Sequence, residues 1–211
     1  MGGCCATDYR RMFSRRSAES DARRYRRRGL TGTAREVVAL AGDVRGASVL
    51  DVGGGVGAIG LELLTEGADH ATNVELSSGY EDAAATLAAE CGVAGRVELR
   101  IGDLVEDRES IASHDVVIMH RVVCCYPDAD ALVGAAADLT RRRLVLTYPQ
   151  ERAWLRLGLG GANAFLRLRR CGFRVHLHPV ATIVGAAERR GLRLERRVAS
   201  GLLWESAALS R

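Results

Sequence analysis

One short stretch, SVLDVGGGVGAIG at residues 48–60, constrains the fold more than any other part of the chain. Its first five residues, Ser48 to Val52, are mostly apolar and include β-branched valines, which predicts a strand buried on both faces. Three consecutive glycines follow, and glycine permits the positive φ angles that a sharp turn requires. From Ala58 onward the apolar residues recur at helical spacing. The stretch therefore predicts a strand, a glycine turn and a helix whose N-terminus presents backbone N–H groups to a ligand.

The glycine spacing of this turn fits two ligand-binding patterns. Gly55, Gly57 and Gly60 match the loose G-x-G-x-x-G dinucleotide fingerprint. The longer pattern is Asp51-x-Gly53-x-Gly55-x-Gly57, in which a carboxylate precedes the glycines. A carboxylate at this position repels a pyrophosphate and attracts an ammonium group. The pattern favours a cationic amino-acid ligand, and a glycine turn that binds nothing is the alternative.

The rest of the chain predicts one α/β domain. Strand patterns occupy residues 71–76, 96–101, 115–119, 143–148, 192–199 and 201–209, and helix patterns occupy 33–40, 81–90, 130–139 and 180–190. This alternation predicts a mostly parallel sheet with helices on both faces. The last two strands are joined through Ser200-Gly201 without a helix, so we expect an antiparallel hairpin there. Residues 48–211 form the predicted core, with an insertion at about 150–175, and residues 1–47 precede it.

Composition narrows the class further. The chain of 211 residues is 47% hydrophobic and 27% charged, as is ordinary for a globular protein. No apolar run is long enough to span a membrane, and the N-terminus lacks a secretory apolar core, so a cytoplasmic location is expected. Six cysteines, including the pairs Cys4-Cys5 and Cys124-Cys125, are then expected to be thiols. Adjacent cysteines lack zinc-site spacing, so no metal is predicted, with metal or redox use as the alternative.

Residues 1–47 are rich in arginine, and Tyr9, Met12, Phe13 and Tyr25 are interleaved among them. A solvated helical surface explains such a run. Basic patches with aromatic residues also bind nucleic acid. Acids such as Glu19 interrupt the run and the net charge is only +4, which disfavours a nucleic-acid partner.

The carboxyl ends of the predicted strands carry polar side chains. Glu75 ends the second strand, where a carboxylate can accept both ribose hydroxyls of a nucleoside. Asp103 follows the third strand, and a turn-forming aspartate is the alternative there. His120 ends the fourth strand, and its near-neutral reference pKa suits a general base. A packing histidine is the plainer reading of His120.

The insertion at about 150–175 has apolar residues at roughly helical spacing, interspersed with arginines. Because it follows the carboxyl end of a strand, we expect it to cover the crevice and to shape a substrate pocket. An amphipathic helix that touches a membrane is the alternative. His178 and Pro179 then mark a helix entry, beside the substrate or simply at a cap.

The segment from Asp51 to Gly57, Glu75 and the terminal hairpin together resemble the class I S-adenosylmethionine-dependent methyltransferases. Within that family, the pattern is most similar to the magnesium-protoporphyrin O-methyltransferase type. The features that carry this second likeness are Tyr148-Pro149, the Trp154-containing insertion, His176-Leu177-His178, Arg190-Gly191-Leu192 and Tyr25 to Gly29. The arginine-rich start, the paired cysteines and His120-Arg121 depart from that type, so no particular substrate is implied.

The resemblance implies a fold, a cofactor and a set of roles. The fold is a Rossmann-like seven-stranded sheet with helices on both faces and an antiparallel C-terminal hairpin, and residues 1–47 form a helical flap over the cofactor. S-adenosylmethionine is the implied cofactor, and a small molecule is the implied methyl acceptor. The alternatives are an RNA-modifying methyltransferase that uses the arginine-rich segment, and a cofactor-binding protein with other chemistry.

Individual roles follow from the same resemblance. Asp51, Gly53 and Gly55 would hold the amino-acid end of the cofactor, Glu75 the ribose and Asp103 the adenine. Further cofactor contacts are implied for Gly54, Gly57, Leu76, Leu104, His120 and Tyr25. His120 is the first candidate base, with Tyr126 and His178 behind it.

Overall fold

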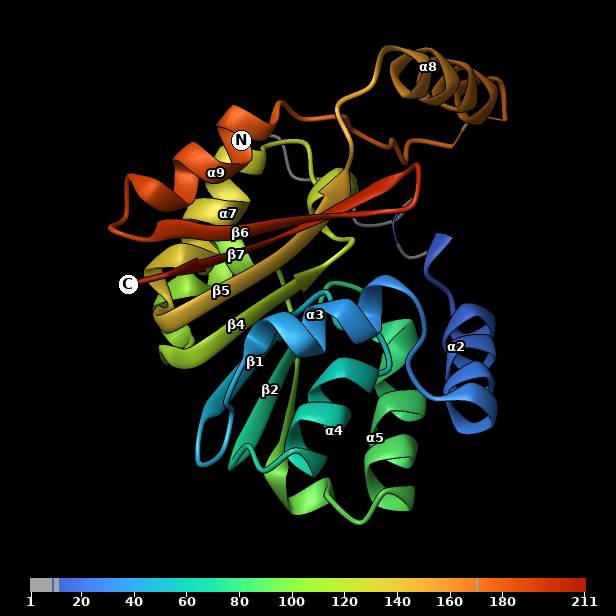
Figure 1. Ribbon diagram of the computed structural model, residues 1–211. Coiled ribbons are helices and arrows are strands. Elements are labelled where there is room, and N and C mark those ends of the chain that lie inside the picture. The colour runs from blue at the N-terminus through green and yellow to red at the C-terminus, as the bar shows by residue number, and fades with distance from the viewer. Residues whose placement is uncertain (1–8, 10–11, 170) are drawn as a thin grey trace.

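The computed structural model describes residues 9, 12–169 and 171–211. Within them a seven-stranded sheet has the order β3-β2-β1-β4-β5-β7-β6 (Figure 1). The strands are β1 (Ser48–Val52), β2 (His70–Glu75), β3 (Val97–Ile101), β4 (His114–His120), β5 (Thr140–Pro149), β6 (Arg193–Ser200) and β7 (Trp204–Ser210). The strands β1 to β5 pair in parallel, and β7 is antiparallel to both β5 and β6. The predicted sheet and its C-terminal hairpin are confirmed.

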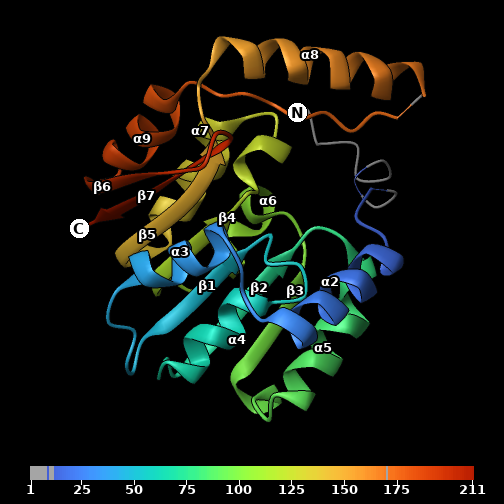
Figure 2. The same ribbon diagram turned by 45° about the vertical axis from the view of Figure 1, so that its right-hand side comes forward.

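Helices cover both faces of this sheet (Figures 1 and 2). One face carries α3 (Thr33–Ala41), α4 (Ala58–Thr65) and α5 (Glu81–Glu90), and the other carries α6 (Leu104–Asp107), α7 (Ala129–Asp138) and α9 (Val180–Glu188). Outside these layers lie α2 (Arg15–Arg28), which packs against α5, and α8 (Ala153–Leu168). Short 3-10 turns lie at Ser78–Tyr80, Ala94–Arg96, Arg108–Ser110 and Val123–Cys125.

The central strand β1 shows why this sheet is buried on both faces. Leu50 and Val52 pack in the apolar cluster that includes α7 and α9, whereas Val49 packs in the cluster that includes α3 and α4. Successive side chains of a strand point to opposite faces, so one five-residue strand contributes to both cores. Asp51 follows the same alternation and points to the face that carries α4, where it is buried.

Two C-terminal boundaries differ from the sequence prediction. The last strand begins at Trp204 and not at Gly201, because Gly201 has φ +65° and residues 201–203 form the turn of the hairpin. The fifth strand is longer than predicted, since β5 pairs over its length with β4 on one side and β7 on the other. Long-range pairing of this kind leaves little trace in local sequence.

The topology places a crevice at one edge of the sheet. In the sheet, β2 and β3 lie on one side of β1, and β4 and β5 lie on the other side. In open α/β sheets a ligand binds outside the carboxyl ends of the strands where this order reverses. That point lies between β1 and β4, directly beside the glycine turn.

Candidate cofactor and active site

The glycine turn after β1 depends on glycine at each position. Gly53, Gly55 and Gly57 have φ angles of +63°, +58° and +74°, which side-chain-bearing residues rarely adopt. At Gly54 the reason is close approach. A Cβ there would lie 2.5 Å from Asp51 Oδ2 and 2.7 Å from Asn73 Oδ1. The backbone of the turn is therefore seated directly over two buried side-chain oxygens.

Asp51 is the electrostatic centre of this turn. Its side chain is 1% exposed, and neither carboxylate oxygen accepts a hydrogen bond of ordinary geometry from the described residues. Burial raises the pKa of Asp51 to about 7, the backbone N–H of Gly60 opposes this shift, and the charge of Glu75 adds to it. A buried carboxylate without a partner is unfavourable, so this position is suited to a cationic ligand group.

The side chains of Glu75 and Asn73 hold the glycine turn against β2 through hydrogen bonds. The buried carboxylate of Glu75 accepts hydrogen bonds from the backbone N–H groups of Gly55 at 3.1 Å and Ser77 at 2.9 Å. Burial nevertheless raises its pKa. The Asn73 side-chain amide donates to the Gly55 carbonyl at 3.0 Å. Asn73 was not predicted, although its place two residues before Glu75 puts both side chains on one side of the strand.

A cavity of about 510 Å³ opens beside this turn, within the range of small-molecule sites. The residues that line it come from the glycine turn, the ends of β2 and β4, α2 and the start of α3. Of the predicted site residues, it brings together Asp51, Gly53, Gly54, Gly55, Glu75, His120 and Tyr25. Gly57 lies instead beside a void of about 10 Å³ between α4 and β2.

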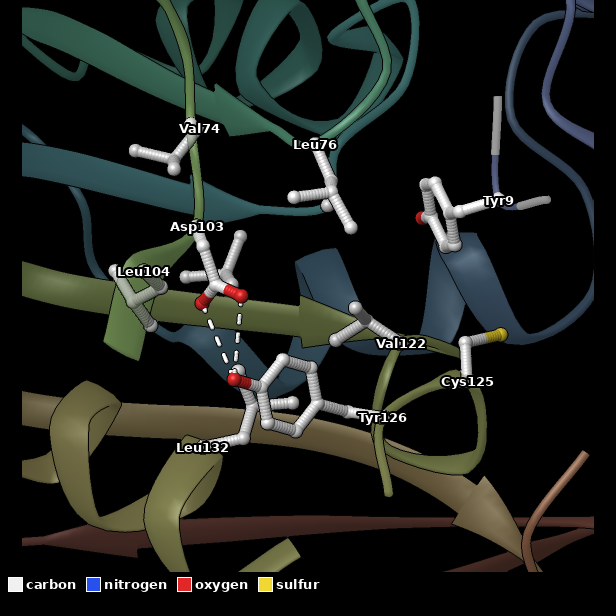
Figure 3. A pocket seen from close by; sticks show the side chains of 12 residues that line it. Tyr9, Val74, Leu76, Asp103, Leu104, Val122, Cys125, Tyr126 and Leu132 are labelled. Carbon is white, nitrogen blue, oxygen red and sulfur yellow. Dashed lines mark hydrogen bonds between the residues drawn. The ribbon is translucent and has the colours of Figure 1, made fainter. Parts of the chain in front are cut away.

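A smaller apolar hollow of about 30 Å³ shares Gly53 and Val122 with the larger cavity (Figure 3). It brings in the remaining cofactor candidates Leu76, Asp103 and Leu104, together with Tyr126. The Tyr126 hydroxyl donates to the carboxylate of Asp103, at 3.2 and 3.3 Å to its two oxygens. Asp103 also accepts from the backbone N–H of Val105 at 2.9 Å and caps α6. Asp103 is thus both a helix cap and part of the hollow.

His120, at the end of β4, faces the larger cavity. Its Nε2 lies 2.8 Å from Oγ1 of Thr33, the first residue of α3. Burial lowers the pKa of His120 to about 4, and the neighbouring charge of Arg121 acts in the same direction. The imidazole is therefore neutral at pH 7. Thr33 was not among the predicted residues, because no local signal connects it to a strand 87 residues away.

His178 lies outside both cavities. Its Nε2 donates to the backbone carbonyl of Tyr126 at 2.9 Å, and its ring stacks on His176 with centroids 5.6 Å apart. The backbone N–H of His176 donates to the carbonyl of Cys124. These contacts tie the segment before α9 to the loop after β4, and the structure does not bring His178 to His120.

Arg121 was not assigned a role from the sequence. It has φ +59°, which is uncommon for a residue other than glycine and marks local backbone strain. Its guanidinium lies 4.5 Å above the ring of Trp204, at the start of β7, and it lines the larger cavity. A cation over an aromatic face is stabilised electrostatically. The residue thus presents a positive charge at the cavity wall without an acidic partner among the described residues.

The described part of the N-terminal segment borders the cavity. Phe13 and Tyr25 line it, and the Tyr25 hydroxyl donates to Glu62 of α4 at 3.0 Å. Phe13 packs edge-on against Phe173 of the late insertion, with ring centroids 5.7 Å apart. These contacts place residues of the predicted flap beside the glycine turn.

The paired cysteines carry no shared site in the described residues. The Cys124 and Cys125 sulfur atoms lie 3.9 Å apart, and Cys4-Cys5 falls outside the part of the chain that the structure describes. In that part, no group of three or more His, Cys, Asp or Glu side chains is placed to hold a metal ion. The helices of the same part include none that is long and apolar enough to cross a membrane.

The fold and the glycine turn are shared with a known class of proteins. Residues 49–143 match the family model of the methyltransferase domain. The seven-stranded sheet with its antiparallel β5-β7-β6 edge is that of the class I S-adenosylmethionine-dependent methyltransferases. The resemblance to the class I methyltransferases is thus confirmed by the fold, and by the family model over residues 49–143.

Solved structures with this fold include several methyltransferases. Magnesium protoporphyrin IX methyltransferase from Synechocystis PCC 6803 with bound SAH has a TM-score of 0.69 at 23% identity, over 85% of this chain and 82% of its own. An O-methyltransferase family protein from Burkholderia thailandensis has a TM-score of 0.70 at 19% identity, over 92% of this chain and 58% of its own. A geranyl diphosphate methyltransferase in complex with SAM has a TM-score of 0.68 at 14% identity, over 85% of this chain and 84% of its own. Curated protein sequences yield no match.

Proposed function

We propose that the protein transfers a methyl group from S-adenosylmethionine to a small-molecule acceptor. The observation that carries this proposal is Asp51, a buried carboxylate that lacks an ordinary hydrogen-bond partner beneath the glycine turn. The ammonium group of an amino-acid moiety offsets such a charge, whereas a pyrophosphate would add a second negative charge to it. The residues present therefore fit S-adenosylmethionine better than a dinucleotide.

The other cofactor contacts follow from the two cavities. Glu75 would hold the ribose, because two backbone N–H groups already fix its carboxylate at the cavity wall. The hollow lined by Leu76, Leu104 and Tyr126 would hold the adenine, with Asp103 at its polar end. The structural relatives that were crystallised with SAM or SAH support this assignment.

S-adenosylmethionine supplies a methyl group that is already activated by the sulfonium. The task left for the chain is to align the acceptor and to exclude water. Phe13 and Tyr25 would close the cavity on the side of α2, so we propose that residues 1–47 act as a flap. The insertion at about 150–175 would border the acceptor, since it follows the carboxyl end of β5.

The three candidate bases are already engaged. His120 is neutral with a lowered pKa and bonds to Thr33, Tyr126 donates to Asp103, and His178 lies outside the cavities. We propose that His120 has a structural role, in which its bond to Thr33 holds the end of β4 against α3 at the cavity wall. It does not accept the proton of the methyl acceptor. Catalysis by alignment suits an acceptor that binds in its deprotonated form.

The RNA-modifying alternative finds less support. Arg15, Arg24 and Arg26 on α2 form ion pairs with Glu19, Asp21 and Glu90. Such pairs reduce the positive charge that a phosphate backbone would contact. Salt-dependent binding of tRNA by the protein is the result that would restore this alternative.

Calorimetry tests the proposal directly. Titration with S-adenosylhomocysteine is expected to give micromolar binding, and titration with NADH none. Transfer of labelled methyl from S-adenosylmethionine to a panel of small acceptors then tests the reaction. Binding of NADH without binding of S-adenosylhomocysteine would overturn the proposal.

A further inference from the structure

The helix α8 carries an apolar stripe on its outer side. Trp154, Leu157, Phe165 and Leu168 are 51%, 79%, 57% and 82% exposed. Together with Gly161 they are spaced three, four, four and three residues apart, so they share one face of the helix. The inward face is different, because Leu155 is buried and Asn163 exchanges hydrogen bonds with the backbone of Val175. The helix is therefore anchored on one side and apolar on the opposite side.

No described residue covers this outer stripe. Figure 2 shows α8 along the outside of the molecule, away from the sheet and its helical layers. A Cβ at Gly158, Gly160 or Gly161 would meet no atom within 4 Å. Glycine in a helix interior is unfavourable relative to alanine, and packing against the described residues does not account for these three glycines. Exposed apolar side chains grouped in this way mark an interaction surface for a protein, a membrane or a ligand.

In the sequence of residues 150–175, which includes α8, the charged residues are almost all positive. Residues 150–175 contain one acid, Glu151, and six arginines, at positions 152, 156, 167, 169, 170 and 174. Glu151 forms an ion pair with Arg156, with 3.6 Å between the guanidinium nitrogen and the carboxylate oxygen. Arg169 lies over the ring of Phe165, 5.3 Å from its centroid, so its charge sits at the edge of the apolar stripe. Arginine stems that follow apolar surface and end in a charge are suited to the boundary between lipid tails and headgroups.

We propose that α8 binds an anionic lipid surface, with its outer apolar stripe below the headgroups and its arginines among the phosphates. Charge decides between lipid and a second copy of the chain. An isologous dimer through this face would bring two like-charged arginine clusters together, whereas anionic headgroups neutralise them. The helix then lies in the interface plane, and its 16 residues do not span the bilayer.

This orientation would turn the site toward the lipid. Strand β5 ends at Pro149, and α8 begins at Ala153, so the helix lies at the edge of the sheet where the cavity opens. A protein docked through α8 would therefore collect acceptors from the membrane surface. The lipid contact itself does not depend on the proposed methyl transfer.

Vesicle sedimentation with the full chain tests the proposal. The protein is mixed with vesicles of phosphatidylcholine alone, or of phosphatidylcholine with phosphatidylglycerol, at low and high salt. Sedimentation is expected with the anionic vesicles and should weaken as salt rises. Leu157→Glu with Phe165→Glu should lower the partition coefficient at least about tenfold. Trp154 emission should shift to the blue on binding, and Trp154→Phe should remove that shift.

Leu194→Glu is the control, since this leucine is exposed near the start of β6, at the opposite end of the hairpin from the turn that bonds to Gln150 just before α8. This control should sediment like the wild type. Calorimetry with S-adenosylhomocysteine on each variant shows whether the cofactor site is intact, which separates failure of the lipid proposal from failure of the proposed function. Absence of sedimentation with anionic vesicles would overturn the proposal, as would an equal loss in the control. A soluble dimer that Leu157→Glu with Phe165→Glu dissolves would assign the face to self-association instead.

Discussion

Replacement of Asp51 by asparagine should make the protein more stable above about pH 7 and should weaken ligand binding at the proposed cofactor site. The carboxyl has a reference pKa of 3.8, and burial raises it to about 7 in the fold. The folded chain then holds this proton more tightly than the unfolded chain, so stability falls as pH rises from about 4 to about 7 and stays level above. A shift of roughly three units corresponds to about 4 kcal/mol at about 1.36 kcal/mol per unit.

The Asp51→Asn variant has no such titration, and its amide can donate a hydrogen bond to Asn73 Oδ1, which has no partner among the described residues. We expect the two proteins to be about equally stable near pH 4, and the variant to be more stable at pH 8, by up to about 4 kcal/mol. Urea unfolding followed by circular dichroism across this pH range measures the difference. Calorimetry should show a loss of S-adenosylhomocysteine affinity in the variant, because the amide carries no charge for the ligand ammonium.

Asp115→Asn is the control with the opposite sign. Hydrogen bonds from the backbone N–H and hydroxyl of Ser48 lower the pKa of Asp115, so its contribution to stability is present above its unfolded pKa and is lost on acidification. That variant should be less stable than the wild type at pH 8. A stability difference between wild type and Asp51→Asn that does not change with pH would refute the reasoning, and unchanged affinity would remove Asp51 from the site.

Three further predictions concern the same site. Glu75→Ala should weaken binding of S-adenosylhomocysteine by about 1–3 kcal/mol in calorimetry, because buried hydroxyls would lose their acceptor; equal affinity would exclude Glu75 from the contact. Gly54→Ala should lower both the melting temperature and the affinity, since its Cβ would lie 2.5 Å from Asp51 Oδ2, whereas Gly95→Ala meets no atom within 4 Å and should change neither. His120→Gln should leave the pH–rate profile between pH 6 and 8 unchanged, because burial lowers the pKa of His120 to about 4; an inflection near pH 6.5 that disappears in the variant would show that His120 is the base.

The sequence was most informative where structure and chemistry are local. The strand, glycine turn and helix of residues 48–65 were predictable because apolar periodicity and glycine content act over a few residues. Asp51 and Glu75 could be placed at the crevice because both accompany strand ends, and the carboxyl ends of parallel strands meet at one edge. The hairpin at the C-terminus followed from the absence of a helix between its strands.

Contacts between distant segments were decided by the tertiary structure alone. Thr33 meets His120, and Arg121 meets Trp204, only because α3 and β7 are packed beside the end of β4. His178 is in turn held outside the cavities by its bond to the Tyr126 carbonyl. These partners are set by strand order and register, which depend on how whole elements bury their apolar faces against one another. A chain read residue by residue therefore shows which groups reach the crevice, and only the packed sheet decides which of them touch.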